Sequence, residues 1–153
     1  MPDPVAQAKA AADRLIRFRP RSEQELRLRL RQKGFEAAAI DGVVQNFARR
    51  DLLNDRKFAQ YYATNRLASR PMGLRALREE LRRKGLDGAV VEQAVATTGG
   101  EYDELAAARE LAQRRRAQMT GLSASAMQRR LAGLLQRRGF SGDVVYKVVR
   151  EVV

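Results

Sequence analysis

The sequence predicts an all-α protein built from three tandem copies of one three-helix module. A pattern of two leucines four residues apart, followed by a basic residue and a glycine, occurs three times. Its glycines are Gly34, Gly85 and Gly139, at intervals of 51 and 54 residues. Leucines at i and i+4 form an apolar stripe on one helical face, and a basic residue before glycine is typical of a helix end. No alternating apolar–polar run of the kind that predicts a strand occurs.

The spacing of the pattern divides the chain into three repeats. Their predicted bounds are residues 1–53, 54–99 and 100–153. A module of about 50 residues buries little apolar surface alone. We therefore expect neighbouring repeats to share buried surface and to stack into an elongated, curved, solenoid-like body. Such proteins usually act as extended binding surfaces rather than as catalysts.

The first repeat reads as three helices. Asp3 is a suitable N-cap and Pro4 a suitable first residue for a helix that Pro20 ends. Ser22, with Glu25 three residues later, forms a capping-box pattern that opens the second helix. The third helix carries the apolar residues Ile40, Val43, Val44 and Phe47.

The second repeat begins at Asn54 and Asp55, which suit an N-cap and a first helical turn. The first helix carries an apolar face of Phe58, Ala59, Tyr62, Ala63 and Leu67. A break at 70–73 separates it from a helix with Leu77 and Leu81 on one face. The third helix carries Val90, Val91, Ala94 and Val95 and ends in the Thr-Thr-Gly-Gly stretch at 97–100.

The third repeat starts near Glu101, breaks around Thr120 and Gly121, and becomes helical again at Ser123 or Ser125. Its first helix carries Leu105, Ala108, Leu111 and Ala112.

In the second repeat, Tyr61 lies off the apolar face of its helix. We interpret it either as an exposed contact residue or as a residue that packs against the neighbouring repeat.

The composition argues against an enzyme. The chain has no histidine and no cysteine, so the usual general base, thiolate nucleophile and transition-metal ligands are missing. No phosphate-binding glycine loop of the Walker or Rossmann type occurs. We expect no catalytic residue, metal site or cofactor, and no disulfide. No apolar run approaches the ~18 residues of a membrane helix, and Met1-Pro2-Asp3-Pro4 lacks the features of a signal peptide.

Two groups of carboxylates have structural explanations. Glu79 and Glu80 precede Arg83 and Lys84 by four residues, a spacing that favours ion pairs on a helix. The group of Glu101, Asp103 and Glu104 suits the first turn of a helix. Three further acid-before-base pairs at this spacing are Glu23–Arg27, Glu25–Arg29 and Glu110–Arg114.

The net charge of +12 predicts attraction to a polyanion, either nucleic acid or an acidic protein surface. The segment 111–142 contains seven arginines and no acidic residue. The candidate residues for binding a partner or a phosphate are Arg31, Arg75, Arg78, Arg82, Arg114, Arg115, Arg116, Arg129, Arg130 and Arg137. Any one of these arginines taken alone is more simply interpreted as part of a solvated helix face. Taken together, they form a stripe across three stacked repeats, which favours a binding surface.

The segment 52–62, Leu-Leu-Asn-Asp-Arg-Lys-Phe-Ala-Gln-Tyr-Tyr, resembles the central signature of the RecX regulatory family. The resemblance continues through the rest of the second repeat, and looser matches in the outer repeats extend it over about 15–149. The residues that carry the signature, which we expect to be mainly structural, are Asp55, Phe58, Ala59, Tyr62, Arg66, Gly73, Leu77, Leu81, Lys84 and Gly85.

The resemblance implies a function as well as a fold. RecX proteins are bacterial cytoplasmic regulators that lie in the groove of the RecA–DNA filament. They hinder filament extension, ATP hydrolysis, strand exchange and the stimulation of LexA cleavage. The resemblance therefore implies a non-catalytic, cytoplasmic protein whose partner is the RecA filament, with single- or double-stranded DNA as a further partner. We expect a monomer, because nothing in the sequence indicates a dimer seam.

Two other functions fit the residues. Three-helix modules with a basic helix can dock on duplex DNA, so a stand-alone DNA-binding protein is the first alternative. A scaffold that recruits another acidic protein is the second.

Overall fold

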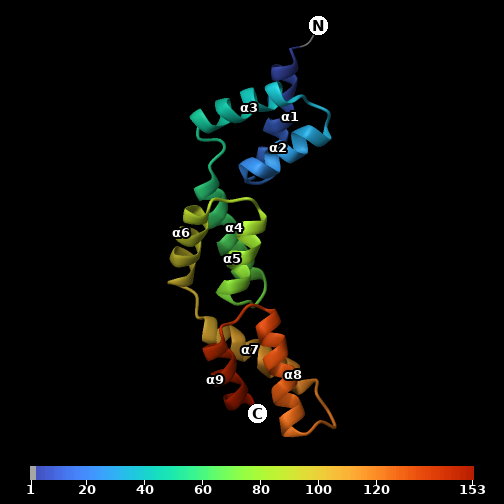
Figure 1. Ribbon diagram of the computed structural model, residues 1–153, viewed down its shortest axis with the longest axis vertical. Helices are drawn as coiled ribbons and strands as arrows, with labels where there is room; N and C mark the ends of the chain where they lie inside the picture. The colour runs from blue at the N-terminus through green and yellow to red at the C-terminus, as the bar shows by residue number, and fades with distance from the viewer. Residues whose placement is uncertain (1–2) are drawn as a thin grey trace.

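The computed structural model describes residues 3–153, which form nine α-helices and no strand (Figure 1). The helices are α1 (Pro4–Phe18), α2 (Glu23–Gln32), α3 (Ala37–Arg49), α4 (Asp55–Ser69), α5 (Leu74–Arg83), α6 (Gly88–Gly99), α7 (Glu104–Ala117), α8 (Ala124–Arg137) and α9 (Gly142–Val152). Residues 1 and 2 lie outside this range. They begin the predicted first repeat and the N-terminal segment for which no signal peptide is expected. The prediction of an all-α fold is confirmed.

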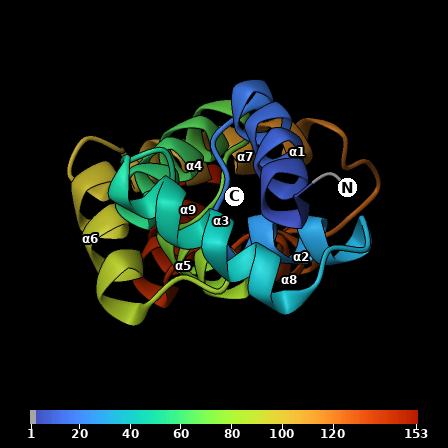
Figure 2. The same cartoon turned by 90° about the horizontal axis from the view of Figure 1, so that it is seen from above.

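The helices form three successive triplets along an elongated molecule (Figures 1 and 2). Within each triplet the first and third helices make the most extensive contact, and the second helix packs against both. Each triplet has its own core, centred on one buried phenylalanine: Phe47, Phe58 or Phe140. The leucine stripe of every second helix is fully buried, as its period predicts. Its members are Leu26, Leu30, Leu77, Leu81, Leu131 and Leu135.

The predicted helix ends are also confirmed. The side chains of Asp3, Ser22, Asn54 and Ser123 accept backbone hydrogen bonds as N-caps at predicted helix starts. Of the acidic group predicted for the first turn of α7, only Glu104 lies there, and Asp103 is the N-cap. Ser123 is therefore the residue at which the third repeat becomes helical again. The glycines of the repeated pattern follow the C-caps of α2, α5 and α8, with φ of 92°, 79° and 87°.

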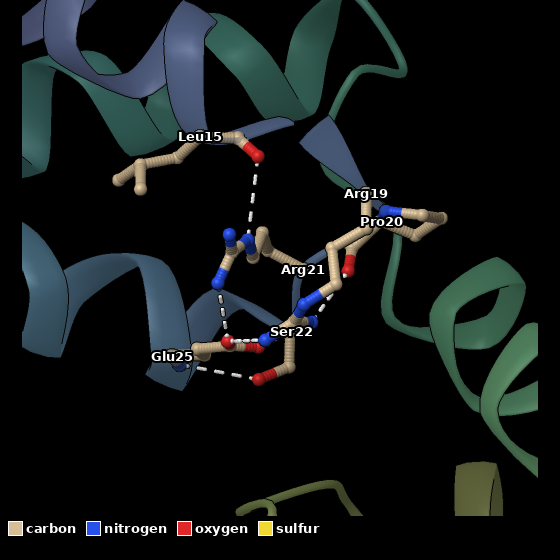
Figure 3. Close-up of polar contacts among 6 residues, drawn as sticks. All are labelled: Leu15, Arg19, Pro20, Arg21, Ser22 and Glu25. Atoms are coloured by element: carbon tan, nitrogen blue, oxygen red, sulfur yellow. Dashed lines mark hydrogen bonds and ion pairs between the residues drawn. The ribbon is translucent and has the colours of Figure 1, made fainter. Parts of the chain in front are cut away.

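The turn between α1 and α2 is held by a partly buried ionic cluster (Figure 3). Arg21 is buried and donates from Nε to the carbonyl oxygen of Leu15, at 3.3 Å, near the end of α1. Its Nη1 donates to Glu25 at 2.8 Å, and Arg19 donates to the same carboxylate. The predicted Glu25–Arg29 pair is therefore wrong. Half of the capping box is present, since Ser22 accepts from the Glu25 amide, but the Glu25 side chain binds the two arginines instead.

A second ionic cluster joins α4 to α5. Glu80 accepts from Arg66 at 2.9 and 3.0 Å and from the Tyr62 hydroxyl at 2.8 Å. The predicted pairing of Glu80 with Lys84 is therefore wrong, and Lys84 instead lies over the Tyr62 ring, 5.3 Å from its centroid. Burial by itself would raise the pKa of the Glu80 carboxyl, but the hydrogen bonds from Arg66 and Tyr62 outweigh it and hold that pKa below its ordinary value.

The repeats share less buried surface than we expected. The three core clusters are separate, and sharing is concentrated at the residues that connect one repeat to the next. Tyr102 of the third repeat packs against the core of the second. The Tyr102 hydroxyl donates to the carbonyl of Met72 at 2.8 Å and accepts from its amide at 3.3 Å.

Each connection between repeats uses the same helix-capping contact. The first residue of α2, Glu23, donates its amide to the carboxylate of Asp55, the first residue of α4, at 2.9 Å. The first residue of α5, Leu74, donates its amide to the carboxylate of Glu104, the first residue of α7, at 3.4 Å. An orphan amide at the start of one helix is thus satisfied by the next repeat.

Glycine allows the repeats to approach closely. A Cβ atom at Gly73 would overlap the backbone of Gly139, and one at Gly139 would overlap Ala76. The Gly73 amide donates to the carbonyl of Arg138 at 2.8 Å. At the first connection, a Cβ at Gly85 would overlap the side chain of Gln24. Gly34 lies in the first of the three repeats, and nothing lies within 4 Å of its Cβ position.

Alanine substitutions separate backbone strain from the contact between repeats. Gly34→Ala introduces only the strain of a positive φ, so we expect the free energy of unfolding to fall by about 1–2 kcal/mol. Gly139→Ala adds an overlap with Ala76, and we expect a total loss of about 2–5 kcal/mol. Urea unfolding followed by circular dichroism measures both.

Gly73→Ala is the matching control for the overlap, because the φ of Gly73 is −82° and suits any residue. We expect a loss of about 1–3 kcal/mol from overlap alone. Equal losses for Gly34→Ala and Gly139→Ala would contradict a tight contact between the second and third repeats.

The Glu80 cluster makes stability depend on pH. Because folding lowers the pKa of Glu80, its contribution is present above the ordinary value of 4.5 and disappears as the pH falls through the folded-state pKa. We expect Glu80→Gln to lower the free energy of unfolding at pH 7 by about 1–2 kcal/mol. This difference from the unsubstituted protein should vanish in urea titrations performed well below pH 4.

Glu79→Gln is the control, since within residues 3–153 Glu79 pairs only with Arg82, at 3.5 Å, on an exposed surface. The predicted pairing of Glu79 with Arg83 is therefore wrong. Its loss should stay below about 0.5 kcal/mol. A pH-independent effect of Glu80→Gln would contradict a role for the ionised carboxylate.

Candidate functional site: an arginine hollow in the third repeat

A surface hollow of about 500 Å³ lies between the end of α7, the connecting segment 118–123 and α8. Four of the ten predicted arginines line it: Arg115, Arg129, Arg130 and Arg137. Met119, Leu122 and Leu134 supply the apolar part of its lining, and Gln118 and Thr120 the neutral polar part. We call this site the arginine hollow.

The local sequence explains why these arginines face the solvent. Leu131, Leu134 and Leu135 bury one side of α8, so the residues around Arg129 and Arg137 occupy the other side. Gly133 lies between these two arginines along the helix and leaves a notch without a side chain. The Nη1 atom of Arg137 lies 3.1 Å from the position that a Cβ of Gly133 would occupy.

The hollow is electropositive because no carboxylate neutralises it. None of its four arginines forms an ion pair within residues 3–153, and its lining contains no acidic residue. Arg138 lies nearby and is partly buried. Its pKa is lowered by burial and, to a smaller extent, by the positive charges of Arg70, Arg115 and Arg66. Cations concentrated in this way favour an anionic ligand.

The predicted arginines of the second repeat have partners inside the protein. Arg75 donates to the carbonyl of Gln136 at 2.8 Å and thereby joins the second repeat to the third. Arg78 pairs with Glu92 at 2.8 Å, and Arg82 lies 3.5 Å from Glu79 and 3.8 Å from Glu92. These three arginines therefore already have partners, while the role of the collective stripe as a binding surface stays a prediction. Glu92 is distant in sequence from these arginines, so a search for i,i+4 partners does not find it.

The remaining predicted arginines lie apart from the hollow. Arg114 pairs with Glu110, as the i,i+4 spacing predicts, and the Glu23–Arg27 pair forms as well. Arg31 on α2 and Arg116 on α7 are exposed and form no ion pair within the described part of the chain.

Sequence reasoning did not select two of the cations near the hollow, Arg70 and Arg138. Arg70 is the C-cap of α4, and Arg138 is the C-cap of α8 and belongs to the repeated pattern itself. A basic residue at a helix end has an ordinary structural explanation, so neither stands out in the sequence. Only the packing of the second repeat on the third brings Arg70 close to Arg138.

Two tyrosines are exposed. Tyr61 is 45% exposed, which agrees with the interpretation as a surface residue and not with packing against another repeat. Tyr146 on α9 is 64% exposed and was not singled out from the sequence. Arg150 donates to its hydroxyl at 2.8 Å and lies over its ring, 5.3 Å from the centroid.

The ten signature residues have structural positions. Phe58, Ala59, Leu77 and Leu81 belong to the core of the second repeat. Tyr62 and Arg66 donate to Glu80, and Lys84 lies over the Tyr62 ring. Asp55, Gly73 and Gly85 lie at the connections between repeats.

The chemistry of the arginine hollow is that of anion binding. Guanidinium groups stay protonated and present several donors in a fixed plane, which suits carboxylate and phosphate oxygens but not proton abstraction. No group of three or more potential metal-ligating side chains occurs within residues 3–153. In the same range, no helix combines the length and apolar character needed to cross a membrane.

Three family models match the chain in order. The first three-helix domain of RecX matches residues 8–46, the second matches residues 54–95 and the third matches residues 101–149. These segments coincide with the three helical triplets.

Individual proteins agree with the family models. The regulatory protein RecX of Streptomyces coelicolor is 36% identical over 151 residues, which cover 99% of this chain and 80% of the relative. That of Thermobifida fusca is 36% identical over 149 residues, covering 97% and 80%. The crystal structure of RecX from Lactobacillus salivarius shares the fold, with a TM-score of 0.81, 20% identity and coverage of 98% and 97%. Three matching domains and near-complete relatives show that this chain belongs to the RecX family of regulatory proteins.

Proposed function

We propose that this protein is a non-catalytic regulator that binds the RecA–DNA filament and inhibits its ATP hydrolysis, strand exchange, coprotease stimulation and extension. The observation that carries the proposal is the match of all three repeats to the RecX domains, in order. The RecA filament is the partner that membership of this family implies, and the bacterial cytoplasm is its compartment.

The shape and charge of the molecule support a groove-binding mode. Its three triplets extend along one axis (Figure 1), so one molecule can contact several successive subunits of a helical filament. A charge of +12 attracts it to a filament that combines acidic protein with nucleic acid phosphate. Inhibition then follows from occupying the groove and opposing the subunit movements that accompany catalysis and growth.

The arginine hollow is the candidate contact within this mode. Its four guanidinium groups have no carboxylate partner within residues 3–153, whereas Arg78 and Arg82 are already paired with Glu92. Binding through unpaired arginines does not first require breaking an ion pair within the protein. The third repeat is therefore expected to contribute more to filament binding than the basic residues of the second.

A stand-alone DNA-binding protein is the second candidate, and the same hollow is the observation that favours it. This function predicts tight, sequence-selective binding of duplex DNA without RecA.

Neutralising the hollow should weaken inhibition of RecA. We expect the unsubstituted protein, at substoichiometric concentration, to slow RecA-dependent ATP hydrolysis on single-stranded DNA. The triple variant Arg129→Gln, Arg130→Gln, Arg137→Gln should need about tenfold more protein for the same inhibition, because contacts between charged groups are lost. A coupled ATPase assay measures both.

The control removes the same charge elsewhere. The triple variant Arg14→Gln, Arg17→Gln, Arg29→Gln changes exposed arginines of the first repeat that form no ion pair within residues 3–153. It should inhibit nearly as well as the unsubstituted protein. No effect of the unsubstituted protein on ATP hydrolysis or filament length would refute the proposed function.

A further inference from the structure

The two flanks of α8 carry different chemistry. One flank forms the arginine hollow. The other borders a groove of about 420 Å³ between α8 and α9, whose lining includes Ala132, Val145, Tyr146, Val149 and Arg150. We call it the tyrosine groove. Arg129 lines both sites, so the two are adjacent across the exposed ridge of α8.

The arginines are spread too widely for one small anion. Arg129 and Arg137 are eight residues apart on α8, which corresponds to about 12 Å along the helix axis. A single phosphate cannot contact guanidinium groups at both ends of this ridge without drawing them together. A chain of phosphates can contact them in succession. The guanidinium of Arg137 lies over Gly133, with Nη1 3.1 Å from the position of a Cβ there, and so offers a donor between the two ends of the ridge.

The tyrosine groove supplies a surface for stacking. Tyr146 is 64% exposed, and Arg150 steadies its ring by a hydrogen bond to the hydroxyl and a contact with the ring face. Exposed aromatic rings beside arginines are the usual platform on which the bases of a single strand stack. Duplex DNA keeps its bases paired and would leave this platform unused.

We propose that a single strand of nucleic acid crosses α8, with its phosphates in the arginine hollow and a base stacked on Tyr146. This inference rests on the proposed function and states which kind of ligand, a single-stranded nucleic acid, the same surface binds. An acidic protein segment fits less well, because it could pair with the arginines but would give the exposed tyrosine and its arginine no aromatic partner.

The binding of a fluorescein-labelled oligothymidylate, followed by fluorescence anisotropy across a salt series, tests the proposal. Each phosphate contact on a single strand contributes about 0.7 to the slope of log K against log salt. The triple variant Arg129→Gln, Arg130→Gln, Arg137→Gln should therefore lower that slope by about 2 and weaken binding at least about tenfold. The triple variant Arg14→Gln, Arg17→Gln, Arg29→Gln carries the same net charge and should retain most of the slope.

Two uncharged substitutions test the geometry. Gly133→Leu places a side chain where the Nη1 atom of Arg137 lies and so displaces this guanidinium without changing the charge; it also replaces a helical glycine with a better helix former, so the fold should persist. It should weaken oligothymidylate binding severalfold. Tyr146→Ala should weaken binding about tenfold by removing a stacking partner. Tyr61→Ala removes an exposed tyrosine from α4 and should have no comparable effect.

Alternative partners give different outcomes. If polyglutamate or a duplex of equal length binds as tightly as oligothymidylate, or if the two triple variants lose the same affinity, the proposal is overturned. Its failure is separable from that of the proposed function. If the protein inhibits RecA but does not bind oligothymidylate at this surface, only this inference is refuted. If it binds oligothymidylate but has no effect on RecA, only the proposed function is refuted.

Discussion

The close approach between consecutive repeats at the glycines of the repeated pattern is the constraint on which the rest of the molecule depends. At the second connection, Gly73 and Gly139 leave no room for a side chain, and the Gly73 amide binds the carbonyl of Arg138. Because each triplet has a separate core, little other buried surface fixes the angle between neighbours. A few backbone contacts and two carboxylate caps, from Asp55 and Glu104, therefore set how the triplets are stacked. The repeated pattern serves two purposes, since its glycine ends a helix and also receives the preceding repeat.

This connection also positions the candidate site. The backbone of α8 is tied to the second repeat through the carbonyls of Gln136 and Arg138. Both lie at the end of the helix that carries Arg129, Arg130 and Arg137. The arginine hollow is thus presented on an element anchored to its neighbour rather than on a free loop, which reduces the conformational entropy lost on binding. The same packing brings Arg70 of the second repeat near Arg138 and raises the local positive charge.

The three repeats share an architecture but distribute their charges differently. In the first, Glu25 draws Arg19 and Arg21 into a cluster that closes the turn between α1 and α2. In the second, Glu80 and Glu92 pair with Arg66, Arg78 and Arg82. In the third, the absence of acidic residues from 111–142 leaves the cations of α8 without such partners. One fold can therefore provide structural arginines in one repeat and ligand-binding arginines in another.

The sequence by itself determined the helices, their caps, the buried leucine stripes and the family, because these depend on local periodicity and on residues a few positions apart. It also identified the acid-free segment that supplies most of the arginine hollow. Tertiary structure alone decided which arginines remain unpaired. Arg78 and Arg82 meet Glu92 through the packing of α5 on α6, and Glu80 binds Arg66 and Tyr62 of α4. Glu25 binds Arg19 and Arg21 of the turn that precedes its own helix. Coulombic attraction and hydrogen bonding depend on distance in space, and a helical triplet brings together residues that no i,i+4 rule connects.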